Sequence, residues 1–210
     1  MSPSGPPGGY PVVERLGGDS AEAWPVLATE DLHRDAWVMA LRSDRIERPG
    51  APPTEGSFTR LVLEHPGAAV VLALDEEDRV LCLAQYRHPV TRRLLELPAG
   101  LCDEPGEDPE AVARRELREE AGLAAREWTH LISAYSSPGL IAEVQHLYLA
   151  RGLSAVDRGD FELAHEEADL EICWVPLAEL TAAVLDGRAQ DAPLALAVLT
   201  LLARREGWGS

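Results

Sequence analysis

The stretch "GEDPEAVARRELREEAG", residues 106–122, predicts a short helix whose two ends are both marked in the sequence. Asp108 suits the N-cap, Pro109 the first helical position and Gly122 the position just past the last turn. We therefore expect a helix over residues 109–121. The segment nevertheless carries six carboxylate side chains, and like charges one helical turn apart repel each other. This concentration of like charges on one helix therefore requires a physical explanation.

The carboxylates of this helix are sorted by side. At about 100° per residue, Glu116 and Glu120 lie one turn apart along one edge of a narrow apolar stripe, and Glu119 lies just beyond them. Mg²⁺ and Mn²⁺ favour clustered carboxylate oxygens and can bridge them to phosphates. Composition alone leaves a second interpretation open, which is a solvated acidic helix with ordinary ion pairs.

The overall charge limits the possible partners of the chain. Among 210 residues, 19 Lys and Arg stand against 36 Asp and Glu, which gives a net charge of -17. This balance argues against a broad electrostatic contact with nucleic acid or an anionic membrane. An anionic substrate would need local compensation from a few arginines or bound cations. The hydrophobic content of 46% is ordinary and predicts one packed domain, with room for a small appendage.

The cysteines and the N-terminus predict a cytoplasmic protein. Cys82, Cys102 and Cys173 are too few and too scattered for a disulfide framework, so we interpret them as reduced, mostly buried thiols. The start "MSPSGPPGGYPVV" lacks the basic and apolar parts of a signal peptide. The longest apolar run, residues 192–203, is too short to cross a bilayer.

The remaining pattern predicts strands on both sides of the central helix. A flexible leader over 1–20 precedes two strands within 36–65, and "AAVVLALDEEDRVLCLAQYRH" has the pattern of a hairpin. Further strands are expected in "RLLELPAG", "WTHLISAYSS", "VQHLYLARGL" and "LEICWVPL", and two helices in "LAELTAAVLDG" and in residues 192–206. Without regular βαβ alternation, this order predicts an α+β or sandwich-like domain.

The longer string "GLCDEPGEDPEAVARRELREEAGL", from Gly100 to Leu123, resembles the Nudix box, G-x5-E-x7-R-E-U-x-E-E-x-G-U with U apolar. The matching positions are Glu107, Arg115, Glu116, Leu117, Glu119, Glu120, Gly122 and Leu123. One departure is that six residues, rather than five, separate Gly100 from Glu107. The extra residue falls before the helix, so it affects the path of the loop more than the spacing of the helical carboxylates.

The resemblance implies an α/β/α sandwich around a mixed sheet, and hydrolysis of a nucleoside diphosphate linked to another group. By the same resemblance, Glu116 and Glu120 would be the main metal ligands, with Glu119 contributing directly or through water. Arg115 would hold the carboxylates by ion pairing, and Glu107 would fix the joint between loop and helix.

Motifs outside the box resemble those of ADP-ribose pyrophosphatases. In "QYRHPV" and "ELPAG", Arg87 would contact the diphosphate or the terminal ribose, Glu96 would place the substrate, and the Ala99 carbonyl would ligate metal. Without the resemblance, Arg87 is an ordinary surface arginine of a strand. In "SSPGL", Pro138 lies fifteen positions after Leu123, an offset associated with ADP-ribose hydrolases. With Gly139 beside it, Pro138 would bind the substrate.

Three further regions complete the expected site. Glu143 would contact a ribose hydroxyl, although a solvent-facing strand residue fits equally well. In "HEEADLEICWVPL", Glu166 or Glu167 would be the catalytic base, with Glu120 as the other candidate. The strands within 36–65 resemble the extra strands through which ADP-ribose pyrophosphatases form an exchanged homodimer. Trp37 and Tyr86 are candidates for stacking on adenine, and each also fits a packing role.

Together these features predict a Nudix fold in the α+β class, with a β extension over 36–65 and a hydrolase domain over 66–206. The expected reaction is Mg²⁺-dependent hydrolysis of ADP-ribose to AMP and ribose 5-phosphate, with Mn²⁺ as a possible substitute. A pyrophosphatase acting on GDP-mannose or ADP-glucose is the alternative within the same class. A non-catalytic Nudix regulator that senses ADP-ribose would be expected to carry a damaged box and a basic extension.

Overall fold

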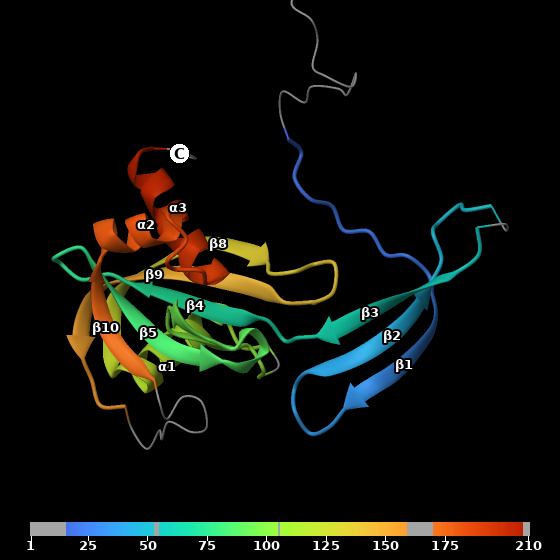
Figure 1. The fold of residues 1–210 in the computed structure, drawn as a ribbon, viewed down its shortest axis with the longest axis horizontal. Coiled ribbons are helices and arrows are strands. Elements are labelled where there is room, and N and C mark those ends of the chain that lie inside the picture. Colours follow the sequence, from blue (N-terminus) through green and yellow to red (C-terminus); the bar gives the residue numbers. More distant parts are fainter. Residues whose placement is uncertain (1–15, 53–54, 105, 159–169, 208–210) are drawn as a thin grey trace, which may run out of the picture.

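The computed structural model describes residues 16–52, 55–104, 106–158 and 170–207. Its strands lie in three sheets (Figure 1). The N-terminal sheet contains β1 (Val26–Arg34), β2 (Ala40–Ile46) and β3 (Phe58–Glu64), in that order. A mixed sheet has the order β7 (Ala99–Leu101), β4 (Ala68–Ala73), β9 (Val144–Ala155) and β8 (Leu123–Tyr135), and a third has the order β10 (Glu171–Pro176), β5 (Arg79–Arg87) and β6 (Arg92–Glu96).

Strand β4 is the centre of the main body. All six of its residues are buried, because helices cover both faces of its sheet. Val70 and Leu72 enter the hydrophobic cluster on the side of α2 (Leu177–Leu185) and α3 (Ala192–Arg205). Ala69 and Val71 enter the cluster on the side of α1 (Pro109–Ala121). β4 pairs in parallel with β9 and antiparallel with β7, so the sheet is mixed as expected.

Helix α1 spans the predicted residues 109–121, which confirms that prediction. The Asp108 side chain accepts a hydrogen bond from the Glu110 N–H (3.1 Å), and Gly122 adopts a left-handed conformation with φ of 65°. Leu117 is fully buried on the face that packs against the mixed sheet. The caps therefore fix where the helix begins and ends, and the apolar stripe fixes which side faces the core.

The predicted hairpin between β4 and β5 is confirmed only at its turn, where the Asp75 N–H donates to the Arg79 carbonyl (3.0 Å). These two strands share a single bridge, Leu74 to Val80, and then separate into different sheets. β4 takes β7 and β9 as its partners, while β5 takes β6 and β10. The short turn between β4 and β5 does not decide which strands become the neighbours of a strand buried on both faces.

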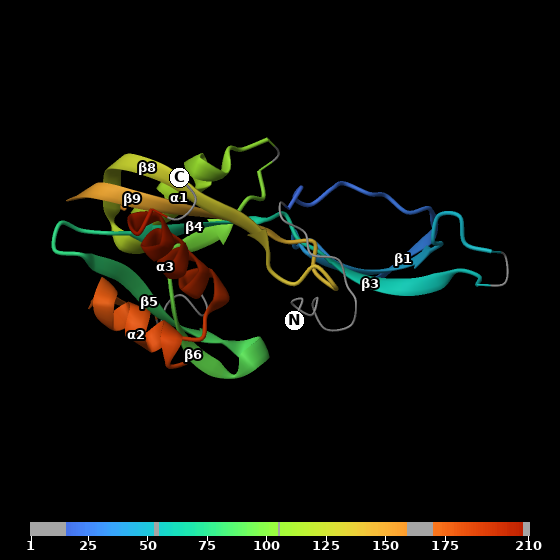
Figure 2. The same ribbon diagram turned by 90° about the horizontal axis from the view of Figure 1, so that it is seen from above.

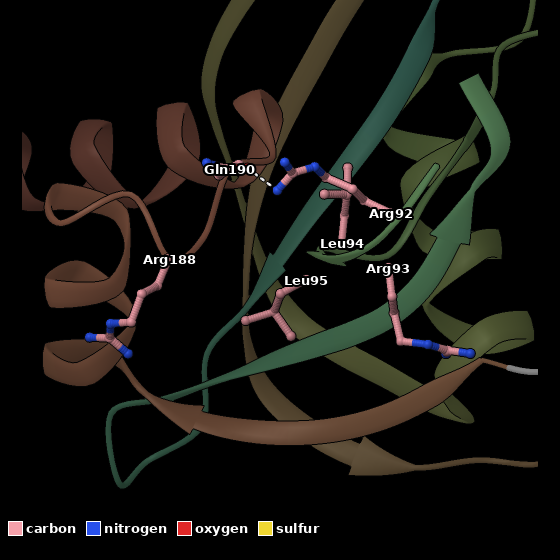
Figure 3. Close-up of a pocket in the computed structure, with 6 residues that line it drawn as sticks. All are labelled: Arg92, Arg93, Leu94, Leu95, Arg188 and Gln190. Carbon is pink, nitrogen blue, oxygen red and sulfur yellow. Dashed lines mark hydrogen bonds between the residues drawn. The ribbon is translucent and has the colours of Figure 1, made fainter. Parts of the chain in front are cut away.

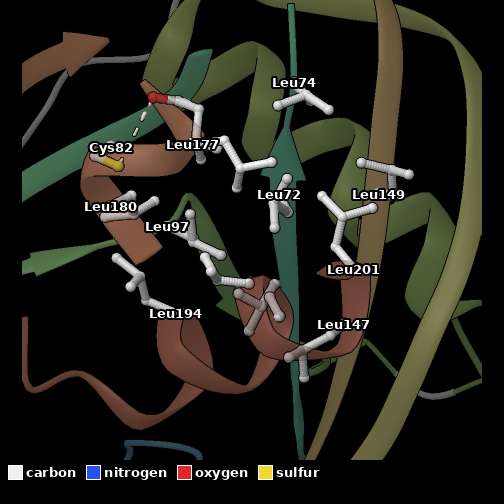
Figure 4. Close-up of a cluster of buried hydrophobic side chains, with 14 of the residues drawn as sticks. Leu72, Leu74, Cys82, Leu97, Leu147, Leu149, Leu177, Leu180, Leu194 and Leu201 are labelled. Carbon is white, nitrogen blue, oxygen red and sulfur yellow. Dashed lines mark hydrogen bonds between the residues drawn. The ribbon is translucent and has the colours of Figure 1, made fainter. Parts of the chain in front are cut away.

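The larger cluster of buried side chains lies between the sheets and the two C-terminal helices, and Figure 4 shows many of its leucines. The predicted strands in "RLLELPAG", "WTHLISAYSS", "VQHLYLARGL" and "LEICWVPL" correspond to β6, β8, β9 and β10, and the predicted C-terminal helices to α2 and α3. The short strand β7 lies where "RLLELPAG" predicted a turn at Pro98 and Gly100. The cysteine prediction holds only in part. All three thiols are free, but Cys102 is half-buried and Cys173 exposed.

The N-terminal sheet extends away from the main body in both ribbon views (Figures 1 and 2). Every residue of β1 is exposed. Ion pairs hold the sheet together, because Arg34 and Arg42 both contact Glu64 and Arg42 also contacts Asp44. The strand β1 is not predicted by the sequence pattern, since "VLATEDLHR" has neither alternating polarity nor a run of β-branched residues. The predicted leader over 1–20 lies largely outside the described residues. Within the described ranges, no helix is long and apolar enough to cross a membrane.

Candidate active site

The candidate site forms where the C-terminal half of α1 meets β7. Glu116 and Glu120 are only 8% and 6% exposed, although both are charged side chains on a helix. Gly100 makes this arrangement possible. A Cβ added to Gly100 would lie 1.9 Å from Glu116 Oε1 and 2.1 Å from its Cδ, so the space that any other residue would fill holds the carboxylate. The glycine at the start of the motif is therefore a direct packing partner of Glu116.

The neighbouring residue of β7 orients the second carboxylate. The Ala99 N–H donates a hydrogen bond to Glu120 Oε2 (3.0 Å). A backbone donor of this kind holds a carboxylate in one direction without neutralising it. Ala99 thus lies beside Glu120, as its predicted role requires. Coordination by its carbonyl stays a prediction.

Arg115 links the carboxylates on the outer side of the helix. Its Nη1 lies 2.6 Å from Glu116 Oε1 and 3.1 Å from Glu119 Oε2. Burial lowers the pKa of Arg115, but Glu116, Glu119 and Glu107 raise it by more, so the guanidinium keeps its charge. Glu107 has a buried Oε2 atom with no hydrogen-bond partner. This arrangement agrees with the ion-pairing role expected for Arg115.

The chemistry of these groups fits a hard divalent cation. Two buried carboxylates, the partly exposed carboxylate of Glu119 and a buried Oε2 atom of Glu107 without a partner supply oxygen ligands of the type that Mg²⁺ and Mn²⁺ prefer. Within the described ranges, no three His, Cys, Asp or Glu side chains already lie in a metal-binding arrangement.

Arg87 and Glu96, both predicted site residues, pair with each other. Arg87 Nη2 lies 2.6 Å from Glu96 Oε2, and Nε lies 2.9 Å from Oε1, so the pair is bidentate. Glu96 is buried, whereas the Arg87 side chain is 44% exposed. The pKa of Arg87 is raised, mainly by the hydrogen bond to Glu96 and further by the charges of Asp191 and Glu120. Arg87 therefore lies within electrostatic range of the carboxylate site.

Asp191 is a residue that sequence analysis missed. It caps α3, with Oδ2 accepting from the Leu194 N–H (2.9 Å). Burial raises the pKa of Asp191 to about 6, and the charges of Glu96 and Glu143 also raise it, while the Leu194 N–H and Arg87 lower it. The signal was available, because Asp followed by Pro two positions later marks a helix start. Its closeness to Arg87 and Glu96 could not be read from the sequence.

The loop between β8 and β9 carries three more predicted residues. Pro138 and Gly139 are exposed. A backbone hydrogen bond joins the loop to β3, because the Leu63 N–H donates to the Leu140 carbonyl (2.9 Å). The Glu143 side chain is 15% exposed and accepts from Gln145 Nε2 (3.1 Å). The charge of Glu143 raises the pKa of Asp191, whose pKa is also affected by Arg87. Glu143 is therefore within electrostatic range of the region around Arg87.

The structure does not bring the two predicted aromatic residues to the carboxylates. Trp37 is 63% exposed in the turn between β1 and β2, on the sheet that extends from the main body. The Tyr86 hydroxyl lies 3.2 Å from His88 Nδ1, and Tyr86 precedes Arg87 on β5, so its side chain points to the opposite face. Glu166 and Glu167 lie outside the described residues.

A pocket of about 200 Å³ opens beside β6, the strand that pairs with β5 (Figure 3). Its lining residues are Arg92, Arg93, Leu94, Leu95, Arg188 and Gln190. Arg92 pairs with Arg87 across β5 and β6, and its Nη1 donates to Gln190 Oε1 (3.4 Å). Arg188 makes ion pairs with Glu179 and Asp186. The pocket therefore borders the strand that carries Arg87.

The chain is similar to known proteins in sequence and in fold. The NUDIX domain family matches residues 63–197. An ADP-ribose pyrophosphatase of Mycobacterium tuberculosis is 42% identical over 182 residues, which are 87% of this chain and 84% of that protein. A GDP-mannose pyrophosphatase of Yersinia enterocolitica is 32% identical over 60% of this chain and 67% of its own. The crystal structure of an ADP compounds hydrolase superposes with a TM-score of 0.71 and 21% identity, over 91% of this chain and 99% of the other.

The raised pKa of Asp191 predicts how stability depends on pH. The pKa of Asp191 is about 6 in the folded protein, whereas its ordinary value is 3.8. Between these two pH values the folded state binds more protons than the unfolded state. The free energy of unfolding therefore falls as the pH rises through that window. Asp191→Asn keeps an N-cap acceptor and removes the charge. We expect a gain in the free energy of unfolding on the order of 1–2 kcal/mol at pH 7.5 that disappears near pH 4. Urea unfolding with a chelator present measures it, and an equal gain at both pH values would contradict the assignment.

Proposed function

The chain belongs to the NUDIX domain family, and from this premise we propose that it hydrolyses the diphosphate bond of ADP-ribose, giving AMP and ribose 5-phosphate. The observation that carries the proposal is the buried pair Glu116 and Glu120 on α1, held against β7 by Gly100 and Ala99. The 42% identity to an ADP-ribose pyrophosphatase over most of both chains supports this substrate over others.

Divalent cations are general in this family, and we propose Mg²⁺ as the physiological ion, with Mn²⁺ able to replace it. Glu116, Glu120 and the Ala99 carbonyl would hold the cations, and Glu119 would add a direct or water-mediated contact. A bound cation would neutralise the diphosphate and stabilise the charge on the leaving phosphate. Such local compensation is needed because a chain with a net charge of -17 otherwise repels a dianionic substrate.

Arg115 has a positioning role in this proposal. It touches both Glu116 and Glu119, so it would keep the two carboxylates ionised and at a fixed separation. Glu107, whose charge acts on Arg115, would hold the guanidinium at the joint between loop and helix. In this role Arg115 would act through Glu116 and Glu119 and would not contact the substrate.

Arg87 would supply the fixed positive charge for the substrate. Its guanidinium is already oriented by the bidentate contact with Glu96, and 44% of its side chain stays exposed. An incoming phosphate can therefore bind the free edge while Glu96 keeps the other edge in place. Glu143, which acts on the same region through Asp191, would contact a ribose hydroxyl.

The base that activates the attacking water would be Glu166 or Glu167, or else Glu120. Of these, Glu120 has an orientation fixed by the Ala99 N–H, which suits a ligand as well as a base. Pro138 and Gly139 would shape the substrate end of the site. Tyr86 and Trp37 would stack on adenine. Because the N-terminal sheet that carries Trp37 extends away from the main body of its own chain, Trp37 would do so in the active site of a second chain.

We also propose that the protein is a cytoplasmic homodimer. The N-terminal sheet exposes Val26, Leu27, Leu32, Trp37, Val38 and Leu61. A small sheet of three strands needs a hydrophobic face that packs against another surface to be stable by itself, so pairing with a second copy would bury these side chains. The three free cysteines agree with a reducing compartment.

A nucleotide-sugar pyrophosphatase is the second candidate, and the similarity to a GDP-mannose pyrophosphatase favours it. Both functions would use the same carboxylates, and they differ only in the group beyond the diphosphate. A non-catalytic regulator fits less well, because Arg115, Glu116, Glu119 and Glu120 are all present and in contact with partners.

A substrate panel tests the function. With Mg²⁺ or Mn²⁺, the wild type should cleave ADP-ribose at least ten times more efficiently, by kcat/KM, than GDP-mannose or ADP-glucose. Glu120→Gln should lower kcat by a factor on the order of 10³, since it removes a charged ligand with little change in shape. Product analysis by chromatography gives both results. Preferential cleavage of a sugar nucleotide would overturn the substrate assignment, and full activity of Glu120→Gln would overturn the site.

The oligomeric state is tested by sedimentation. At micromolar concentration we expect the mass of two chains. Trp37→Ala should leave that mass unchanged but raise KM for ADP-ribose several-fold, because a stacking contact contributes on the order of 1 kcal/mol. Exposed Leu185 on α2 offers a control, Leu185→Ala, with unchanged KM. A single-chain mass at all concentrations would contradict the dimer.

A further inference from the structure

Two of the three cysteines lie directly opposite each other on neighbouring strands. Cys82 on β5 and Cys173 on β10 are register partners in the antiparallel pair. Residues directly opposite in such a pair present their side chains to the same face of the sheet. The two thiols, separated by 91 positions in the sequence, are therefore cross-strand neighbours.

The hydrogen-bond pattern defines the spacing of this pair. Further along the same register, the Leu177 N–H donates to the Asp78 carbonyl (2.8 Å), which marks a hydrogen-bonded pair. The two kinds of pair alternate along antiparallel strands, and Cys173 lies four residues from Leu177. Cys82 and Cys173 therefore form a hydrogen-bonded pair, with a Cα separation of about 5.5 Å. Disulfides span Cα separations of roughly 4.4–6.8 Å.

The two thiols differ in access. Cys82 is fully buried in the cluster under α2, and Figure 4 shows it beside Leu177 and Leu180. Cys173 is exposed, and it lies on an edge strand, because β10 pairs only with β5 among the described strands. Burial raises the pKa of Cys82 to about 12, with a smaller increase from Cys173, and burial also raises the pKa of Cys173. Both groups rest as thiols, and reagents reach Cys173 first.

We propose that Cys82 and Cys173 form a reversible cross-strand disulfide, and that the oxidant is a low-molecular-weight disulfide such as oxidised glutathione. The deprotonated Cys173 sulfur attacks one sulfur of the oxidant, which forms a mixed disulfide and releases one thiol. The deprotonated Cys82 sulfur then attacks the Cys173 sulfur, closes the intramolecular bond and releases the second thiol. Two protein thiols are oxidised, and one small disulfide is reduced to two thiols.

Geometry makes this bond easy to reverse. The Cβ atoms of a hydrogen-bonded pair are about 5.5 Å apart, whereas a disulfide requires a Cβ–Cβ separation of about 3.5–4.5 Å. Closure must therefore draw the edge strand β10 toward β5, and the strained bond that results is readily reduced. Reduced thiols remain the resting state of a cytoplasmic protein, and the bond forms only when the thiol pool is oxidised.

Oxidised glutathione tests the proposal on the intact protein. The wild type at pH 8 should lose two hydrogen masses, and peptide mapping without reductant should recover Cys82 linked to Cys173. Dithiothreitol should restore both thiols. Cys173→Ser should show no mass loss, and Cys82→Ala should keep one glutathione on Cys173. Because Cys102 is half-buried on a different part of the fold, Cys102→Ser serves as the matched control and should behave like the wild type.

Two results would overturn the proposal. One is a wild type that stops at a glutathione adduct on Cys173, which would mean that the strands cannot approach. The other is a mass loss that persists in Cys173→Ser, which would place Cys102 in the bond. If Cys82→Ala unfolds, Cys173→Ser still decides the outcome, because its substitution is at an exposed position.

Discussion

The close approach of Gly100 to Glu116 is the constraint on which the site depends. The carboxylate occupies the space of a missing Cβ, so β7 and α1 can pack closely while a charged side chain remains between them. The Ala99 N–H binds Glu120 one turn further along the helix. Two residues of β7, Ala99 and Gly100, thus fix the positions of Glu120 and Glu116, and Arg115 contacts Glu116 and Glu119 on the outer side of the helix.

The opposing charges around this set explain how an acidic chain can bind an anion. Arg87 lies on β5, is paired with Glu96, and is influenced by Glu120 and Asp191. The Arg87 guanidinium therefore lies within electrostatic range of the carboxylate cluster. The charges of Arg87 and Asp191 act on each other: Asp191 raises the pKa of Arg87, and Arg87 lowers the pKa of Asp191. The region is balanced locally although the chain as a whole is strongly negative.

Sequence alone predicted the parts of the fold that depend on local pattern. Asp108, Pro109 and Gly122 mark the ends of α1 because capping is a local interaction. The partners of β4 could not be predicted in this way, since a strand buried on both faces carries no sign of its neighbours, and the predicted hairpin with β5 is limited to a single bridge at the turn. Likewise, "ELPAG" predicted that Glu96 and Ala99 matter, but only the three-dimensional structure brings Asp191 from α3 to the same place.

Binding of Mn²⁺, measured by electron paramagnetic resonance, tests the central claim most directly. Gly100→Ala would drive a methyl group into the Glu116 carboxylate, whereas Gly17→Ala adds a methyl group that meets nothing within 4 Å. The account predicts that the wild type and Gly17→Ala share the same tight Mn²⁺ binding, and that Gly100→Ala weakens it at least tenfold while its circular dichroism stays native. Equal Mn²⁺ affinity in all three proteins would contradict the account.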